Sequence, residues 1–521
     1  MSSFTQAREP PCPAESRVSA TDVGDIQLPQ AEAESGAQDS AITDFLKYLR
    51  ANGLEESDFN IDPRSFPRHF RINPLYEESN PDVQKRGGLL KALEQDFGER
   101  PRAVNWLPSR CQVFEIDSSV KLTSSELFTQ KKNARWNPAI YGIDASSCAA
   151  ALALDPHPGD NVLDVCCAPG AKLCFLANLM DQKGSLTGVD ISAERLRSTW
   201  KMAVRYGVAD AHGGSSGAAN PWHLRIFQGD GTTFAEGPPT IVAGRQKWST
   251  LDCNRDGECM LILDSKERAA MASRSKRSLK MHRTMRSKMA HRSCNQSEPQ
   301  NVKRARTTDR DTEAKPHATE QYGNCADAHT DADATAHGVM SLSAPQQTEP
   351  LYDRVLVDAE CTHDGSVRHI SKFKDWGWHT FASRVLNQDR LRTLPALQRR
   401  LLLNGYLRLR PGGTLVYSTC SLCRAQNEEV VEWFLRQPDV LATQTHLVPI
   451  TFAGTTAPIP ARPCMSTAAM HAARHANDSG GGSQTRDDHD PLNIKYCFRL
   501  GPAISRSSGL FVAKFVKGAQ S

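Results

Sequence analysis

Short apolar segments separated by helical patterns constrain the fold of this chain more than any other feature of its sequence. The segments span residues 161–165, 185–190, 223–230, 354–361, 413–421 and 509–515. Helical patterns at 172–180 and 192–207 separate the first three of them. Strands that alternate with helices at this spacing predict an α/β fold with a doubly wound, mostly parallel sheet.

Composition divides the rest of the chain. Residues 1–40 are rich in Ala, Ser, Pro, Glu and Gln and poor in aliphatic side chains, which predicts a disordered tail. Residues 41–135 mix short apolar patterns with turns and a helical pattern near Leu89–Phe97, so we expect a small α+β domain there. The main domain is then expected to cover residues 136–521.

Two long insertions interrupt this main domain. Residues 236–350 lose the strand–helix rhythm and contain basic clusters at 273–292 and 303–306. Segments of this length outside regular structure are functional or disordered, so we expect a flexible insertion. Within it, the apolar run at 259–263 is interpreted as a strand-like decoy. Residues 461–490 are expected to form a second flexible insertion because of their Gly, Ser and charged content.

Charge and composition exclude several classes of protein. Lys and Arg number 63 against 59 Asp and Glu, and a net charge of +4 is too small for a histone-like polycation. The sequence has no run of 18 apolar residues, so we expect no membrane span. Its first residues lack the apolar core of a secretory signal. The 15 cysteines are therefore expected to be reduced thiols in an intracellular protein.

A glycine-containing loop follows the first of the predicted parallel strands. It runs from Asp164 to Lys172 and opens a helix, whose free N–H groups suit a carboxylate, a ribose or a phosphate. Neither the dinucleotide spacing G-x-G-x-x-G nor the P-loop spacing is present. An ordinary strand–turn–helix corner is the alternative. The loop residues that we assign to cofactor binding are Cys166, Cys167, Ala168, Pro169, Gly170, Ala171 and Lys172.

Acidic residues end the next two predicted strands. Asp190 follows Gly170 by 20 residues, which is the spacing of an acid that binds ribose hydroxyls. Asp230 is placed to reach the base of the same nucleoside. Alone, Asp190 would be read as a helix N-cap and Asp230 as a turn residue. Together with the glycine loop, they predict a nucleoside-type cofactor.

Two cysteines end the later predicted strands. Cys361 follows Asp358 in the sequence DAEC, and Cys420 lies in YSTCS. Because ligands of open α/β sheets bind at the carboxyl ends of strands, both thiols are expected to face the cofactor crevice. A lone cysteine is usually a buried small hydrophobe, but this pair beside an acid predicts a nucleophilic thiol. A structural zinc site needs a second matching pair, so we predict no metal.

These motifs resemble those of the Nop/Sun family of RNA cytosine-5 methyltransferases. DVCCAPGAK resembles the family's cofactor loop, GVDISAERL its ribose-binding acid with the following Arg195, and DRVLVDAEC and LVYSTCS its two cysteine motifs. The resemblance covers roughly residues 100–235, 350–435 and 495–515. The departures are Ala171 and His363, where the family commonly has glycine, and Glu360, where it commonly has proline.

The resemblance implies a class I, Rossmann-like methyltransferase fold and S-adenosylmethionine as the methyl donor. It implies that Cys420 attacks C6 of cytosine, so that C5 becomes nucleophilic enough to accept the methyl group. Cys361 would help to release the product, and Asp358 would bind the cytosine edge and help to protonate N3. Lys172 would orient the pocket. Residues 41–135 resemble the family's N-terminal RNA-binding module.

Several alternatives stay open at this point. A DNA cytosine-5 methyltransferase would carry a Pro-Cys dipeptide after the early strand and a later Glu-Asn-Val, and this chain has neither at those places. A non-catalytic RNA-binding scaffold would not need the intact thiols. Transfer RNA and ribosomal RNA are both possible substrates, with transfer RNA favoured. We expect a monomer that binds no membrane. The KRAR cluster at 303–306 favours the nucleus or nucleolus over the cytoplasm. Residues 273–345 are expected to add salt-dependent RNA affinity and to be dispensable for folding.

Overall fold

A computed structural model describes the sheet, its helices and the N-terminal domain of the chain. The described residues are 43, 46–54, 66–74, 81–120, 139–209, 222–239, 241–242, 245–246, 259–264, 350–366, 387–470 and 490–519. The predictions for residues 1–40 and 273–345 lie outside these ranges, as do those for most of the two insertions.

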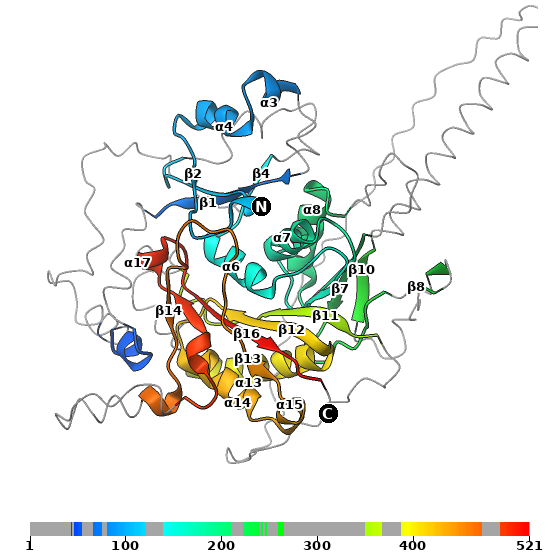
Figure 1. Ribbon diagram of the computed structural model, residues 1–521, viewed down its shortest axis with the longest axis vertical. Coiled ribbons are helices and arrows are strands. Elements are labelled where there is room, and N and C mark those ends of the chain that lie inside the picture. The colour runs from blue at the N-terminus through cyan, green and yellow to red at the C-terminus, as the bar shows by residue number, and fades with distance from the viewer. Residues whose placement is uncertain are drawn as a thin grey trace, which may run out of the picture. The chain divides into compact units, whose positions relative to one another are not determined.

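A ten-stranded sheet forms the centre of the main domain (Figure 1). Five adjacent strands are parallel, in the order β7-β6-β5-β11-β12. Their bounds are β5 (Asn161–Asp164), β6 (Ser185–Asp190), β7 (His223–Gly229), β11 (Tyr352–Asp358) and β12 (Leu409–Thr419). Strand β16 (Leu510–Val516) then joins β12 antiparallel. The predicted strands and the doubly wound, mostly parallel sheet are therefore confirmed.

Helices cover both faces of this sheet (Figure 1). One face carries α6 (Ala145–Leu154), α7 (Ala171–Leu179) and α8 (Ala193–Arg205), and the other carries α13 (Gln388–Leu407), α14 (Glu428–Leu435) and α15 (Pro438–Ala442). Helix α6 is buried along its whole length except at Ser147, and it is apolar from Cys148 to its end. Helix α8 buries Leu196, Thr199 and Ala203 and leaves charged side chains exposed, as a helix with one apolar stripe does. None of the helices in the described ranges has the length and apolar character needed to cross a membrane.

The interpretation of residues 259–263 as a decoy is wrong. Strand β10 (Cys259–Asp264) pairs antiparallel with β7 and ends the sheet on that side. The rhythm of βα units cannot reveal such a strand, because an antiparallel edge strand needs no crossover helix. Residues 241–242 and 245–246 form the short strands β8 and β9, which pair with each other. The first residues of the second insertion, β14 (Ala461–Pro463), pair with β15 (Phe498–Leu500). A further short strand, β13 (His446–Leu447), pairs with β16.

The N-terminal region forms its own four-stranded antiparallel sheet, in the order β2-β3-β1-β4. The strands are β1 (Arg68–Ile72), β2 (Arg102–Ala103), β3 (Val113–Ile116) and β4 (Ile140–Gly142). The predicted helix is α4 (Leu89–Phe97), and α3 (Pro81–Lys85) precedes it. Because β4 belongs to this sheet, the small sheet continues beyond residue 135.

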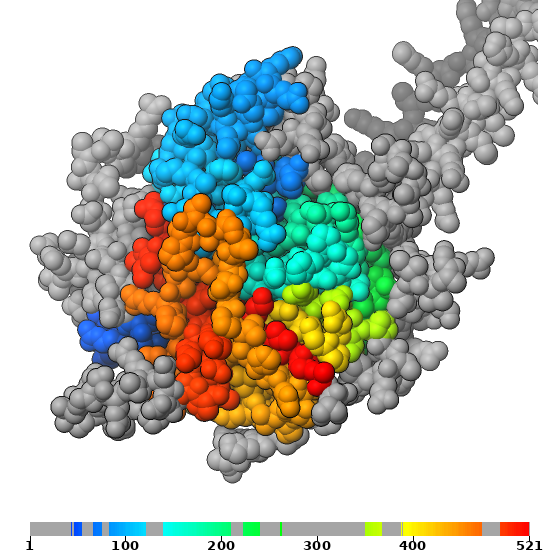
Figure 2. Space-filling model, viewed as in Figure 1, coloured from blue at the N-terminus to red at the C-terminus, as the bar shows by residue number. Residues whose placement is uncertain are grey.

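This small domain contacts the main domain through β1. The Arg71 guanidinium lies over the Phe175 ring and donates to the Asn178 side chain at 2.8 Å, both on α7. Figure 2 shows the blue N-terminal residues against the cyan and green residues of the main domain. The contact is polar and aromatic, so it fixes the domain on the helical face that carries α7.

Candidate active site

The site lies where the strand order of the sheet reverses. From β5 the chain adds β6 and β7 on one side, and then returns to add β11 and β12 on the other. Ligands of doubly wound sheets bind at the carboxyl ends of strands beside such a point. The structure places there a cleft of about 710 Å³, a size typical of small-molecule sites.

The cleft gathers most of the residues predicted from the sequence. Those that line it are Cys166, Ala168, Lys172, Asp190, Arg195, Asp230, Asp358 and Cys420. Five predicted residues do not line it, although they lie in or behind the same loops. They are Cys167, Pro169, Gly170, Ala171 and Cys361.

Gly170 is required by helix packing as well as by the turn. Its φ is +107°, and it is the N-cap residue of α7. A Cβ atom there would lie 3.0 Å from both Cα and Cγ2 of Thr199 on α8. The space over this glycine is therefore filled by a neighbouring helix. Cys166 and Ala168 are the loop residues that line the cleft.

Asp190 is buried and joins the glycine loop to the start of α8. Its two oxygens accept from the backbone N–H of Ala168 at 3.2 Å and of Ser192 at 2.9 Å. Arg195 lies 3.5 Å from the same carboxylate and donates to the Ala168 carbonyl at 2.5 Å. Asp190 thus both lines the cleft and braces the loop, and a carboxylate has lone pairs left for a ribose hydroxyl.

Asp358 and Lys172 form an ion pair across the cleft. The Lys172 ammonium donates to Asp358 Oδ2 at 2.7 Å, and Ser418 donates to Oδ1 at 2.7 Å. Burial alone would lower the pKa of Lys172, but the adjacent Asp358 carboxylate outweighs it and the pKa is raised. Lys172 is therefore a cation at neutral pH, and it holds Asp358 in one orientation toward the cleft.

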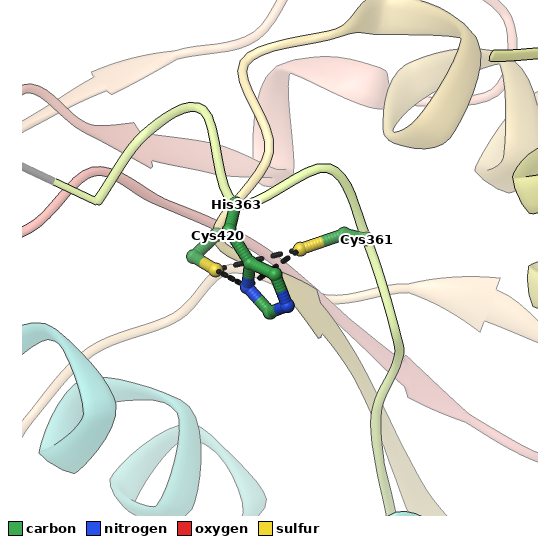
Figure 3. Close-up of side chains that lie close together, drawn as sticks. All are labelled: Cys361, His363 and Cys420. Carbon is green, nitrogen blue, oxygen red and sulfur yellow. Dashed lines mark hydrogen bonds between the residues drawn. The ribbon is translucent and has the colours of Figure 1, made fainter. Parts of the chain in front are cut away.

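The two thiols lie close together, next to His363 (Figure 3). Sγ of Cys361 lies 3.4 Å from Sγ of Cys420, and Nδ1 of His363 lies 3.0 Å from the Cys420 sulfur. Cys361 is 1% exposed, whereas Cys420 is half-buried and reaches the cleft. The Cys420 contact and burial both raise the pKa of Cys361. Cys361 is therefore a protonated thiol at neutral pH.

These two thiols and His363 have the donor atoms that soft metal ions bind. The group has three such side chains and, within the described ranges, no fourth His, Cys, Asp or Glu ligand close enough to complete it. A structural zinc site has four ligands, so this group does not make a structural zinc site.

Asp164 is a buried member of the site that the sequence motif contains but to which no role was assigned. It ends β5, and its Oδ1 accepts from the Cys166 N–H at 3.3 Å. Its Oδ2 has no hydrogen-bond partner among the described residues. Burial, aided by the charge of Asp358, raises the pKa of Asp164 to about 8. This carboxyl is therefore neutral at pH 7.

Asp164→Asn is expected to stabilise the protein more at pH 8 than at pH 5. Between a pKa near 3.8 in the unfolded chain and about 8 in the folded one, the folded protein holds a proton that the unfolded chain has lost. Stability from this group is therefore present at low pH and falls as the pH rises toward 8. Urea unfolding of both proteins without ligand should show the variant's advantage growing by at least about 1 kcal/mol. An advantage that is equal at both pH values would contradict the neutral carboxyl.

The N-terminal helical residues 46–51 reach the loops that carry the two cysteines. The Tyr48 hydroxyl donates to Asp364 Oδ2 at 2.6 Å, and Asn52 accepts from the Arg424 backbone N–H at 2.7 Å. Asp364 is fully buried and also accepts from the Leu422 N–H at 3.1 Å. This contact could not be predicted from a local sequence pattern, because the two segments lie more than 300 residues apart.

Tyr48→Phe is expected to destabilise the protein, because Asp364 loses a donor in a buried position. Hydrogen bonds to charged groups contribute about 1.5–3 kcal/mol, so the free energy of unfolding should fall by roughly that amount. Urea unfolding measures it. Tyr496→Phe is a matched control outside the cleft. If the two variants have equal stability, Tyr48 does not hold the cysteine-bearing loop.

Other lining residues escaped the sequence analysis. Among them are Asp144, Ser146 and Ser147 at the start of α6, His363 and Ser366 after β11, Leu397, Arg400 and Leu401 on α13, and Ser508 and Leu510 at β16. Only the first group carries a local signal. Asp144 caps α6 by accepting from the Ser146 N–H, and an Asp before an apolar helical run indicates such a cap.

The fold and the cleft define a class I, Rossmann-like methyltransferase domain, with acidic residues and thiols at the carboxyl ends of its parallel strands. A sequence model of the family "16S rRNA methyltransferase RsmB/F" matches residues 151–215 and 330–473. These two segments of the chain are thus similar to the methyltransferases of the RsmB/F (Sun) family. The resemblance found in the sequence motifs is confirmed.

Curated relatives share short segments with this chain. A tRNA (cytosine(49)-C(5))-methyltransferase from Pyrococcus abyssi is 41% identical over 92 residues, which are 18% of this chain and 26% of that protein. Ribosomal RNA small subunit methyltransferase F from Klebsiella pneumoniae is 42% identical over 85 residues, 16% of each. A mitochondrial tRNA (cytosine(34)-C(5))-methyltransferase from Mus musculus is 35% identical over 104 residues, 20% of this chain and 26% of that protein. The matches thus span about a quarter or less of each relative.

Solved structures resemble the chain over a greater length at lower identity. A methyltransferase homologue from Pyrococcus horikoshii has a TM-score of 0.43 and 21% identity, covering 87% of each chain. NSun6 from the same organism has a TM-score of 0.45 and 14% identity, covering 91% of this chain and 97% of that one.

Proposed function

We propose that this protein transfers a methyl group from S-adenosylmethionine to C5 of cytosine in RNA. The observation that carries the proposal is that Cys420, with the buried Cys361 thiol against it, lines the same cleft as the Asp358–Lys172 ion pair in a Sun-family-like methyltransferase domain. The relatives named above are RNA methyltransferases, two of them named for C5 of a tRNA cytosine.

Three features support S-adenosylmethionine as the occupant of the cleft. Asp190 and Asp230 line it at the ends of adjacent strands, which suits a ribose and a base. A Cβ atom at Gly231 would meet the Val165 side chain at 2.8 Å, so the cleft wall there has no room for a larger residue. The unpartnered Asp164 oxygen lies directly before the lining residues Val165 and Cys166. When bound, this donor supplies an electrophilic methyl group.

The chain's own residues supply the activation of cytosine. C5 of cytosine is a weak nucleophile, and addition of the Cys420 sulfur to C6 converts the ring to an enamine. Asp358 accepts from the exocyclic amine, and its ion pair with Lys172 places an ammonium proton beside it for N3. General acid assistance of this kind contributes about 10²–10⁴-fold in rate. Cys361, held as a neutral thiol against Cys420, assists release of the product.

RNA is the proposed partner, through the N-terminal domain and the cleft. The small sheet domain contacts α7, the helix that the cofactor loop opens, so RNA bound there would lie beside the cleft. Both transfer RNA and ribosomal RNA fit this proposal, because single-stranded loops of either can present an unstacked cytosine. Transfer RNA is the substrate that we favour.

Bisulfite sequencing of RNA from cells that lack the gene tests this proposal. We expect at least one cytosine to lose protection in these cells and to regain it when the wild-type gene is restored. A gene that encodes Cys420→Ala should not restore protection. An unchanged bisulfite pattern would favour a non-catalytic RNA-binding scaffold.

Asp190→Ala is expected to weaken binding of S-adenosylmethionine at least about tenfold, because a hydrogen bond to a charged group contributes about 1.5–3 kcal/mol. Calorimetric titration with S-adenosylmethionine measures the affinity. Glu194→Ala, an exposed acid at the start of α8, is the matched control and should bind as the wild type does. Because Asp190 also braces two loops, unfolding of each variant is measured in parallel. A folded Asp190→Ala variant with wild-type affinity would remove Asp190 from the site.

A further inference from the structure

His363 occupies a position that the described reaction does not yet use. Its imidazole lies beside both sulfurs, with Nδ1 3.0 Å from Sγ of Cys420 and 3.7 Å from Sγ of Cys361 (Figure 3). Both His363 and Cys420 line the cleft, and the His363 side chain is exposed to it. The ring nitrogen is thus within reach of the thiol proton of the residue proposed to attack cytosine.

The backbone holds this imidazole in place. His363 has a φ of +58°, in the left-handed region that non-glycine residues rarely adopt. The turn around it is closed by the Ser366 N–H, which donates to the His363 carbonyl at 3.1 Å, and by the Gly365 N–H, which donates to the Cys420 carbonyl at 2.9 Å. A histidine kept in such a conformation at a ligand cleft points to a use of its side chain.

The charges around the ring suit a group that gains a proton. The hydrogen bond to Cys361 is the main cause that raises the pKa of His363; Asp358 also raises it, whereas burial and Arg390 lower it. Arg390 is itself 3.7 Å from Glu360, the exposed acid at the cleft edge. The positive charge of Lys172, near Cys420, is balanced by the carboxylate of Asp358. While Cys361 stays a neutral thiol, the Asp358 carboxylate is the charge among these that favours an imidazolium.

We propose that His363 is the base that accepts the proton of Cys420 when this thiol adds to the cytosine ring. The inference rests on the proposed function. The S–H bond breaks and its proton goes to Nδ1 of His363, while the sulfur electron pair forms the Sγ–C6 bond. The C5=C6 electron pair shifts through C4 onto N3, where the Asp358–Lys172 pair donates the compensating proton. Once C5 carries the methyl group, N3 returns its proton to the Asp358–Lys172 pair. The C5–H bond then breaks, its proton passes to water and its electron pair forms C5=C6 while the C6–S bond breaks. The imidazolium returns its proton to the departing sulfur.

Alkylation of Cys420 by iodoacetamide tests this proposal without any methyl transfer. The full chain is treated at pH 7 with a reductant and a chelator present, and the modified Cys420 peptide is followed by mass spectrometry. A model thiol is only a few per cent thiolate at this pH, and an imidazole-paired thiolate is somewhat less nucleophilic per molecule. We therefore expect Cys420 to react about tenfold faster in the wild type than in His363→Gly or His363→Asn.

The variants are chosen to separate the imidazole from the backbone. Glycine and asparagine both tolerate a positive φ, so neither should strain the loop. Imidazole added to the buffer should restore fast alkylation in His363→Gly and leave the wild type unchanged. His446→Gln is the matched control, because His446 is an exposed residue of strand β13. This variant should react as the wild type does.

The outcomes separate this proposal from the proposed function. Wild-type alkylation rates at pH 7 in both His363 variants would overturn the role of His363, whatever the methylation result. If the wild type methylates no RNA but its fast Cys420 alkylation depends on His363, the imidazole–thiol pair stands and the proposed function fails. If RNA is methylated, His363→Gly should lower kcat, and added imidazole should raise it. A lowered kcat that imidazole does not raise would also count against the base.

Discussion

Cys361→Ala is expected to accumulate a covalent protein–RNA adduct that survives denaturing electrophoresis, and Cys420→Ala is expected to form none. Cys420 is half-buried and lines the cleft, whereas Cys361 is buried behind it with its sulfur 3.4 Å away. Of the two thiols, Cys420 is the one that is placed to reach a base in the cleft. Loss of Cys420 therefore prevents attack, and loss of Cys361 leaves attack intact but slows release.

The size of the Cys420→Ala effect should be large. Removing a covalent nucleophile typically lowers turnover by 10³-fold or more, so methyl transfer should be at least about 10³-fold slower. The double variant should behave like Cys420→Ala, because attack precedes release. Cys497→Ala, a buried thiol outside the cleft, is the matched control. An adduct in Cys420→Ala alone would make Cys361 the nucleophile, and loss of activity in both single variants without any adduct would indicate structural thiols.

Asp358→Asn is expected to lower kcat by about 10²–10⁴-fold, the range of general acid–base assistance. The amide cannot keep the charge that pairs with Lys172 at 2.7 Å, so both the acceptor for the cytosine amine and the position of the ammonium are lost. Steady-state methyl transfer to RNA under saturating S-adenosylmethionine measures the effect.

Asp353→Asn is the control for that variant. Asp353 lies on the same strand, β11, but at the end that does not line the cleft. There its carboxylate is 2.5 Å from the Arg410 guanidinium. The same chemical change there should leave kcat near the wild-type value. If Asp358→Asn is as active as Asp353→Asn, the ion pair has no part in the reaction.

The central sheet could be predicted from the sequence because its strands are buried on both faces. Such strands appear as continuous apolar runs, and β5, β6 and β7 each lie within a predicted segment. The ends of these strands then follow from topology alone, which is why Asp190, Asp230, Asp358 and Cys420 were found to line one cleft. A local pattern sufficed where the fold repeats one local unit.

Contacts made between distant segments could not be predicted in this way. Strand β10 pairs antiparallel at the sheet edge, and its short apolar run lies in a part of the sequence that lacks the strand–helix rhythm. Tyr48 bonds to Asp364 from the far end of the chain. The sequence marks His363 only as a residue that stands where the family commonly has glycine. The position of its ring beside the two sulfurs depends on the turn after β11. Each of these depends on tertiary packing rather than on periodicity.

The most direct test of the proposed function is methyl transfer in the purified system, with the product identified. The full chain is incubated with S-adenosylmethionine that carries a tritiated methyl group and with total RNA that lacks the modification. The RNA is then digested to nucleosides. We expect the label in 5-methylcytidine with the wild type and its absence with Cys420→Ala. Label in another nucleoside, or no transfer to any RNA by the folded wild type, would contradict the assignment.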